Sequence, residues 1–120
     1  MTTRLDTDRL FKTIDQMDPD EFAEFVTEDG TFVFGNAEPV TGRQAVRDAV
    51  AGFYSSIKAL QHEIGQTWEG DDTLVTEARV TYTRHDGSAI TLPFVNVFRL
   101  RGDLVRDYRI YIDIAPLYAG

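Results

Sequence analysis

Hydrophobic residues recur at helical spacing through the first half of the chain. A first apolar stripe consists of Leu10, Phe11, Ile14 and Met17. This stripe predicts a first helix that ends near Met17. Asp18 and Pro19 suit an N-cap and a first helical residue, so we expect a second, short helix that stops at Asp29-Gly30. A capping-box sequence beginning at Thr41 precedes a wide apolar stripe, which predicts a third helix. That stripe is Ala45, Val46, Ala49, Val50, Phe53, Tyr54 and Ile57.

The spacing changes to alternation in the second half of the chain. Residues 31–35 already alternate as a brief strand, and from Leu60 onward apolar and polar positions alternate in longer runs separated by glycine-containing turns. The longer predicted strands cover residues 60–69, 74–84, 90–100 and 104–112. Helices followed by a strand meander predict an α+β fold in which the helices gather on one face of a curved, mainly antiparallel sheet.

The strand predicted at residues 90–100 is apolar on both faces. Phe94 and Phe98 lie on one face, and Val95 and Val97 lie on the other. An antiparallel sheet with one face in water would alternate more cleanly. We therefore expect a second copy of the chain to cover the outer face in a homodimer. The residues expected in this interface are Val80, Tyr82, Val95, Val97 and Tyr111.

The composition narrows the possible chemistry and partners. A chain of 120 residues supports one core, so we expect a single domain over residues 1–120. Cysteine is absent, which excludes disulfides and thiolate chemistry, and two histidines without a spaced ligand set lead us to expect no metal and no cofactor. The net charge of −8 argues against nucleic acid. Because no signal peptide or membrane-spanning run is evident, we expect a cytoplasmic protein without membrane contact.

Four motifs occur in an order that resembles a known family. They are Asp18-Pro19-Asp20-Glu21, Phe32-Val33-Phe34, Thr41-Gly42-Arg43-Gln44-Ala45-Val46 and, in the terminal hairpin, Tyr108-Arg109-Ile110-Tyr111-Ile112-Asp113. Nearly the whole chain resembles the nuclear transport factor 2-like superfamily, and within it the group of SnoaL-like polyketide cyclases, ketosteroid isomerases and limonene epoxide hydrolases. The resemblance implies a cone-shaped, barrel-like fold with three N-terminal helices packed on the sheet. That fold carries isomerases, cyclases, hydrolases and non-catalytic binding subunits.

The catalytic groups of these families match the chain only in part. The arginine of the epoxide hydrolases falls at Arg79, but their two aspartates fall at Thr81 and Ile110, which argues against epoxide hydrolysis. Neither the oxyanion-hole tyrosine nor the base aspartate of the ketosteroid isomerases is matched by a competent side chain. Their second oxyanion donor, a protonated carboxylic acid, falls at Asn96, whose amide donates a hydrogen bond without needing a shifted pKa.

His62 and Asn96 are candidates for chemistry on the inner face of the sheet. The alternation places His62 on one face with Leu60, Ile64 and Trp68. Its imidazole suits a general base near neutral pH, and the alternative is a satisfied histidine in the core or at a pocket rim. Asn96 is an amide among apolar residues, so it either anchors a ligand or bonds to a neighbouring side chain or water.

Arg79 and Asp113 have competing interpretations. Alternation directs Arg79 outward, whereas the family alignment directs it inward as an electrostatic assistant; we follow the alignment and expect Glu77 as its partner. The alternative is an exposed ion pair that contributes little stability. Counting along the last strand gives Asp113 a structural role at the sheet edge or dimer seam rather than a catalytic one.

The resemblance and the candidate residues together predict a SnoaL-like small-molecule pocket protein. One hypothesis is a cofactor-independent isomerase or cyclase that transfers a proton on a hydrophobic carbonyl compound of polyketide, terpene or steroid type, with His62, Asn96 and Arg79 as catalytic groups. The alternative is a non-catalytic ligand-binding or association module of the same fold. The predicted pocket residues are Phe32, Phe34, Phe53, Tyr54, Trp68, Phe94, Tyr108 and Ile110.

Overall fold

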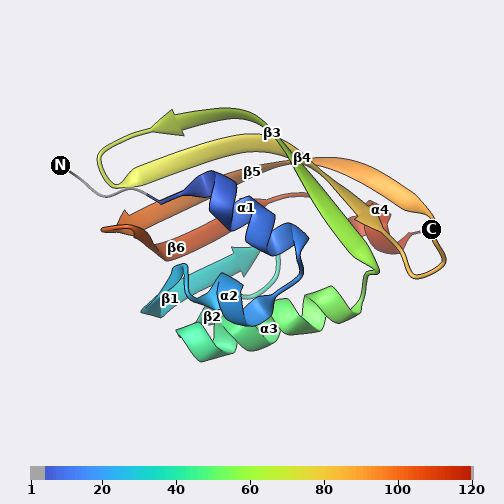
Figure 1. The fold of residues 1–120 in the computed structure, drawn as a ribbon, viewed down its shortest axis with the longest axis horizontal. Helices are drawn as coiled ribbons and strands as arrows, with labels where there is room; N and C mark the ends of the chain where they lie inside the picture. Colours follow the sequence, from blue (N-terminus) through green and yellow to red (C-terminus); the bar gives the residue numbers. More distant parts are fainter. Residues whose placement is uncertain (1–4, 120) are drawn as a thin grey trace.

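Helices and strands follow one another in the order shown in Figure 1, a computed structural model that describes residues 5–119. The helices within this range are α1 (Thr7–Asp15), α2 (Pro19–Ala23), α3 (Arg43–Ser55) and α4 (Ala115–Tyr118). The strands are β1 (Val26–Phe34), β2 (Val40–Thr41), β3 (Ala59–Glu69), β4 (Thr73–Thr83), β5 (Ala89–Arg101) and β6 (Leu104–Tyr111). None of the helices in residues 5–119 is long and apolar enough to cross a membrane.

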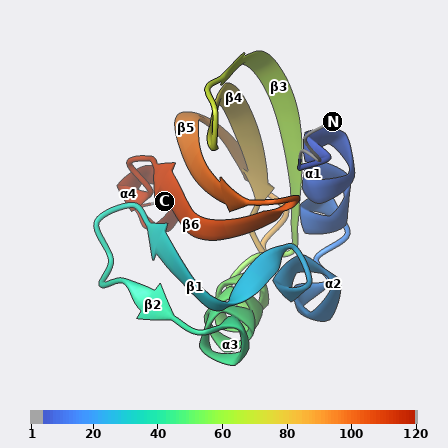
Figure 2. The ribbon, with the colours of Figure 1, turned by 90° about the vertical axis from the view of Figure 1, so that its left-hand side faces the viewer.

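The six strands form one curved sheet in the order β2-β1-β6-β5-β4-β3. All neighbouring strands are antiparallel except β1 and β6, which are parallel. Figure 2 shows α1, α2 and α3 on the concave side of this sheet. The predicted α+β class is therefore confirmed, but the sheet stays open between its edge strands β2 and β3, and only α1 and α3 among the four described helices are long.

The helices α1 and α2 begin at side-chain caps, whereas α3 begins at Gly42 without the capping-box hydrogen bond that the sequence predicts. Asp18 accepts a hydrogen bond from the backbone N–H of Glu21 at 3.1 Å, and Pro19 is the first residue of α2. However, α2 ends at Ala23, and the residues predicted to continue it form the start of β1 instead. The reason is tertiary, because the backbone carbonyl of Phe25 accepts a hydrogen bond from the N–H of Val105 at the start of β6.

The short helix α4 was not predicted from the sequence. Its first turn is supported by Asp113, whose Oδ1 accepts a hydrogen bond from the backbone N–H of Ala115 at 3.1 Å. At its other end the guanidinium of Arg84, beside the β4–β5 turn, donates to the backbone carbonyls of Pro116 and Leu117. The first of these bonds gives Asp113 a structural role. The bonds from Arg84 depend on a side chain 32 or 33 residues away in the sequence.

A β-bulge at Gly65 changes which face of β3 points inward. Ile64 pairs with Ala78, but the register shifts before Gln66, so Trp68 pairs with Val75 on the outer face. A Cβ at Gly65 would lie 3.0 Å from the backbone oxygen of Glu77, which explains a glycine at this position. Trp68 is 47% exposed, and our placement of its side chain in the pocket was wrong.

The orientation of β4 follows simple alternation rather than the family alignment. Its inner face carries Val80 and Tyr82, which are buried, and its outer face carries the exposed Glu77 and Arg79. Both the inward orientation of Arg79 and the place of Val80 and Tyr82 in an outer interface were therefore wrong. The backbone alternates residue by residue, and β4 has no bulge that would change this.

Candidate functional site

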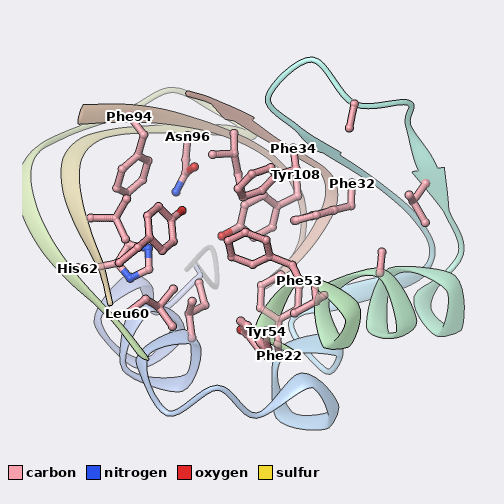
Figure 3. Close-up of a pocket in the computed structure, with 18 of the residues that line it drawn as sticks. Phe22, Phe32, Phe34, Phe53, Tyr54, Leu60, His62, Phe94, Asn96 and Tyr108 are labelled. Carbon is pink, nitrogen blue, oxygen red and sulfur yellow. The ribbon is translucent and has the colours of Figure 1, made fainter. Parts of the chain in front are cut away.

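A cavity of about 220 Å³ lies between the concave face of the sheet and the helices (Figure 3). Seven of the eight predicted pocket residues line it: Phe32, Phe34, Phe53, Tyr54, Phe94, Tyr108 and Ile110. The missing one is Trp68. Val80 and Tyr82 line the cavity instead, because they belong to the inner face of β4. The wall is dominated by aromatic and aliphatic side chains, which is typical of a site for a small apolar molecule.

His62 lines this cavity and is paired with a carboxylate that the sequence did not reveal. Its Nδ1 lies 2.6 Å from Oδ1 of Asp15, the last residue of α1. The backbone N–H of His62 also donates to both oxygens of this carboxylate, each at 3.1 Å. The His62 side chain is only 9% exposed and that of Asp15 is 27% exposed. The two residues therefore form a partly desolvated Asp–His dyad at the cavity wall.

The dyad determines which nitrogen of His62 can accept a proton. A carboxylate only accepts hydrogen bonds, so the neutral ring must carry its proton on Nδ1 and donate it to Asp15. The lone pair of Nε2, on the opposite edge of the ring, is then free to act as a base. The ring is held in place by Phe11, with centroids 5.0 Å apart, and by Phe94, with centroids 5.4 Å apart.

Asn96 provides a polar group from β5, a different part of the cavity wall. It is only 1% exposed, and Figure 3 shows its side chain projecting into the cavity with the amide nitrogen foremost. Its Oδ1 is buried without a hydrogen-bond partner, as is Oγ1 of Thr76, the residue opposite on β4. The amide nitrogen faces the cavity and can donate a hydrogen bond, so Asn96 is a candidate for a contact with an oxygen of a ligand.

Three buried tyrosines add hydroxyl groups to the wall. Burial raises the pKa of Tyr54 well above its usual value, and the negative charge of Asp15 adds to this effect. Burial also raises the pKa of Tyr82 and of Tyr108. These hydroxyls stay protonated near neutral pH, so they offer hydrogen-bond donors rather than negative charges.

The raised tyrosine pKa values predict a loss of stability in alkali. Tyrosines of the unfolded chain lose their protons near pH 10, whereas Tyr54, Tyr82 and Tyr108 keep theirs while the protein is folded. The stabilisation is complete below about pH 10 and is lost as the pH rises above it, because the unfolded state then binds fewer protons. Urea unfolding at increasing pH should show this fall, and the part of the tyrosinate absorbance that comes from the three buried tyrosines should appear together with unfolding.

Tyr82→Phe provides the control for the alkaline loss, because it removes one of the three titrating groups and keeps the ring. We expect the free energy of unfolding to fall less steeply above about pH 10 in this variant than in the wild type. A urea midpoint that stayed constant between about pH 8 and pH 11 would contradict the buried, protonated tyrosines.

Arg79 does not take part in this site. It lies in a depression on the outer face, together with Glu63, Glu77, Pro93 and Tyr111. The structure therefore brings together His62 and Asn96 of the three predicted catalytic groups and separates Arg79 from them. Within residues 5–119 no group of three or more histidine, cysteine or carboxylate side chains could hold a metal ion.

Asp15 is the candidate functional residue that sequence reasoning missed. It lies 47 positions before His62, and only the packing of α1 against β3 brings the two together. One local signal was present, because an acidic residue at the C-terminal end of a helix is opposed by the helix dipole. An unfavourable position of this kind suggests a compensating role elsewhere in the fold.

Comparisons with known proteins agree with this architecture. The family model of the SnoaL-like domain matches residues 7–108. A protein with a ketosteroid isomerase-like fold from Catenulispora acidiphila, solved with trimethylamine, is 19% identical with a TM-score of 0.82, covering 92% of this chain and 86% of that one. An NTF2-like protein of unknown function from Burkholderia pseudomallei is 14% identical with a TM-score of 0.83, covering 92% and 90%.

Among curated proteins no sequence matches significantly. The two structural similarities concern the fold alone, because their sequence identities are low. The family match covers most of the chain, and the open sheet with helices on its concave face is the arrangement that the match implies. The chain therefore belongs to the SnoaL-like domain family.

Proposed function

We propose that this protein is a cofactor-independent isomerase or cyclase that transfers a proton on a hydrophobic carbonyl compound. The observation that supports this most directly is the Asp15–His62 dyad, which places an oriented base in the wall of an apolar cavity. A general base held in this way typically contributes about 10²–10⁴-fold to a rate. The aromatic and aliphatic lining suits a hydrophobic ketone of polyketide or terpene type.

The reaction begins when Nε2 of His62 removes a proton from the carbon next to the substrate carbonyl. The electrons of that C–H bond form a carbon–carbon double bond, and the carbonyl oxygen gains the negative charge of an enolate. Asn96 donates a hydrogen bond to this oxygen, where the charge develops. The protonated His62 then returns the proton to another carbon, which gives an isomer. Alternatively, the enolate carbon attacks a second carbonyl carbon and closes a ring, and the alkoxide formed at that carbonyl takes the proton from His62.

Asp15 stabilises the intermediate stage of this cycle. When His62 carries the extra proton, the two side chains form an ion pair, with the imidazolium donating from Nδ1 across the 2.6 Å contact. The pair is shielded from water by its neighbours, so its electrostatic interaction is stronger than that of an exposed pair. Asp15 thus orients the base and offsets its positive charge without touching the substrate.

The experiment that tests this function is hydrogen–deuterium exchange on 2-tetralone, an uncharged two-ring ketone with acidic C–H bonds. The wild-type protein in D₂O should exchange these protons faster than buffer, as followed by proton NMR. Ala49→Trp, which places a large ring at the cavity wall, should suppress the exchange. Ala45→Trp, on an exposed part of the same helix, should not. Wild-type exchange no faster than buffer would contradict this function and favour the non-catalytic binding module.

We also propose that the outer face of β3, β4 and β5 binds a second copy of the chain. Apolar and aromatic side chains gather there, and no described helix covers this face (Figure 2). They are Trp68, Val75, Val95, Val97 and Tyr111. Glu77 and Arg79 of one copy can meet Arg79 and Glu77 of the other, because a two-fold axis makes such a surface self-complementary.

If the chain forms this homodimer, a charged side chain at the centre of the interface should dissociate it. Val97→Lys introduces a buried, unpaired cation into the interface, so sedimentation equilibrium should show a monomer in place of the wild-type dimer. Ala45→Lys on the exposed part of α3 is the matched control and should stay dimeric. A wild-type monomer at micromolar concentration would contradict the proposal.

A further inference from the structure

The cavity wall contains no cationic side chain among residues 5–119. The guanidinium groups that approach the core serve other partners: Arg43 donates to the carbonyl of Val26, and Arg84 donates to the carbonyls that end α4. Arg79, the cation that the sequence placed in the site, faces outward. A carboxylate or phosphate entering this cavity would therefore lose its water without gaining a positive partner, which is costly.

Negative charge at the cavity strengthens this exclusion. Glu38, in the exposed connection between β1 and β2, lines the cavity. The carboxylate of Asp15 lies behind His62, and the whole chain carries a net charge of −8. An anion would meet repulsion on approach, at the rim and at the dyad.

The polar atoms that face the cavity select for a hydrogen-bond acceptor. Tyr108 and Asn96 are each 1% exposed, and Figure 3 shows the Tyr108 hydroxyl and the Asn96 amide nitrogen directed into the space. Asn96 pairs with Ile110, and Phe98 pairs with Tyr108, so the two donors are diagonal neighbours about 7–8 Å apart at the backbone.

Phe94 is a neighbour of both the base and Asn96 in the cavity wall. Its ring lies 5.4 Å from that of His62, and it precedes Asn96 by two residues on the same face of β5. A flat ring lying over Phe94 can direct its oxygen toward Tyr108 and Asn96 while its edge faces His62. The cavity volume of about 220 Å³ is below the range of about 300–1,000 Å³ for drug-sized ligands. The ligand therefore has one ring or two fused rings.

We propose that the cavity selects an uncharged one- or two-ring compound with an oxygen bound by Tyr108 and Asn96, and that it excludes acids of the same shape. This binding preference does not depend on catalysis. Only the statement that the bound compound is the substrate rests on the proposed function. The proposal assigns Tyr108 a role in binding the oxygen of the ligand. It also states a charge rule: the cavity binds uncharged compounds and excludes anions of the same shape. A nucleotide or carboxylic acid substrate is excluded by the same rule, because it carries a negative charge near neutral pH.

Equilibrium binding of 2-naphthol and 2-naphthoate to the wild-type protein tests the charge rule. The two probes share their rings, but near pH 7 the phenol is neutral and the acid is ionised. We expect 2-naphthol to bind at least about tenfold more tightly than 2-naphthoate. Glu38→Lys, at an exposed position that leaves the core unchanged, should narrow this difference by improving the binding of 2-naphthoate.

The substitution Tyr108→Phe tests whether the Tyr108 hydroxyl donates a hydrogen bond to the ligand. Losing one hydrogen bond should weaken 2-naphthol binding by about three- to tenfold, whereas the exposed outer-face substitution Tyr111→Phe should change nothing. Circular dichroism establishes that both variants are folded. If Tyr108→Phe does not fold, the wild-type and Glu38→Lys affinities decide the proposal alone.

Three outcomes overturn the proposal: no binding of 2-naphthol, equal binding of both probes, or a folded Tyr108→Phe variant with unchanged affinity. These are separate from the outcomes of the exchange assay. A protein that prefers 2-naphthol but fails to exchange 2-tetralone contradicts the proposed function and supports the charge rule. A protein that exchanges the protons of 2-tetralone but binds both probes equally supports the proposed function and contradicts the charge rule.

Discussion

His62→Gln is expected to lower the rate of 2-tetralone exchange by about 10²–10⁴-fold, the usual contribution of a general base. Glutamine has a similar size and can still bond to Asp15, but it has no basic nitrogen at the position of Nε2. The initial rate of deuterium incorporation measures the effect, and the temperature of unfolding shows whether the variant remains folded. Exchange at the wild-type rate in folded His62→Gln would exclude the dyad as the base.

Asp15→Asn should reduce exchange at least about tenfold while leaving His62 itself in place. An asparagine removes the negative charge that stabilises the imidazolium, and its amide can favour the wrong tautomer. Nitrogen NMR of the His62 ring separates orientation from simple destabilisation, because the proton on Nδ1 should shift or move to Nε2. Glu63→Gln, an exposed carboxylate one residue beyond His62, is the matched control and should keep both the rate and the tautomer.

Phe98→Ala is expected to destabilise the fold by about 3–5 kcal/mol, the largest effect we expect from a single core substitution. Phe98 has no exposed surface, and its ring lies edge-on to that of Tyr108 with centroids 4.7 Å apart. It also contacts Phe11 of α1 at 6.4 Å, so it joins the sheet to a helix. Removing the ring leaves a cavity beside the Tyr108 side chain that the surrounding strands cannot readily close.

Urea unfolding measures this loss, and Tyr118→Ala provides the comparison. Tyr118 is also aromatic but is 59% exposed, so its truncation should cost less than about 1 kcal/mol. Similar urea midpoints for the two variants would contradict the large loss of stability expected at Phe98. A large loss at Phe98 should be accompanied by weaker ligand binding, because Tyr108 would no longer be held in position.

Local patterns predicted most elements because the cause of each element is local. The apolar stripe from Val46 to Tyr54 became the buried side of α3, and alternation within β4 and β5 gave the correct inner faces. The exceptions have tertiary causes. The end of α2 was wrong because Phe25 pairs with Val105 across the sheet, and α4 was missed because Arg84 supplies hydrogen bonds from far along the chain.

Trp68 lies on the outer face of the sheet because one inserted residue changes the alternation along β3. Alternation extended from His62 puts Trp68 inward, but the bulge inserts one extra residue and reverses every later position of β3. Gly65 was a visible signal, because an isolated glycine within a strand suggests a bulge. The sequence could therefore have raised this possibility, but only the pairing with β4 shows where the register changes.

The sequence by itself determined the family, the α+β class and the apolar character of the inner faces, because these depend on short-range periodicity and motif order. It also identified His62 and Asn96 as polar residues on an otherwise apolar surface. Only the tertiary structure decided the chemistry they can share. It brought Asp15 to His62 across 47 residues, turned Arg79 away from the cavity, and left Tyr108 and Asn96 facing a cavity whose lining has no lysine or arginine among residues 5–119. Each of these placements depends on how elements distant in the sequence pack together.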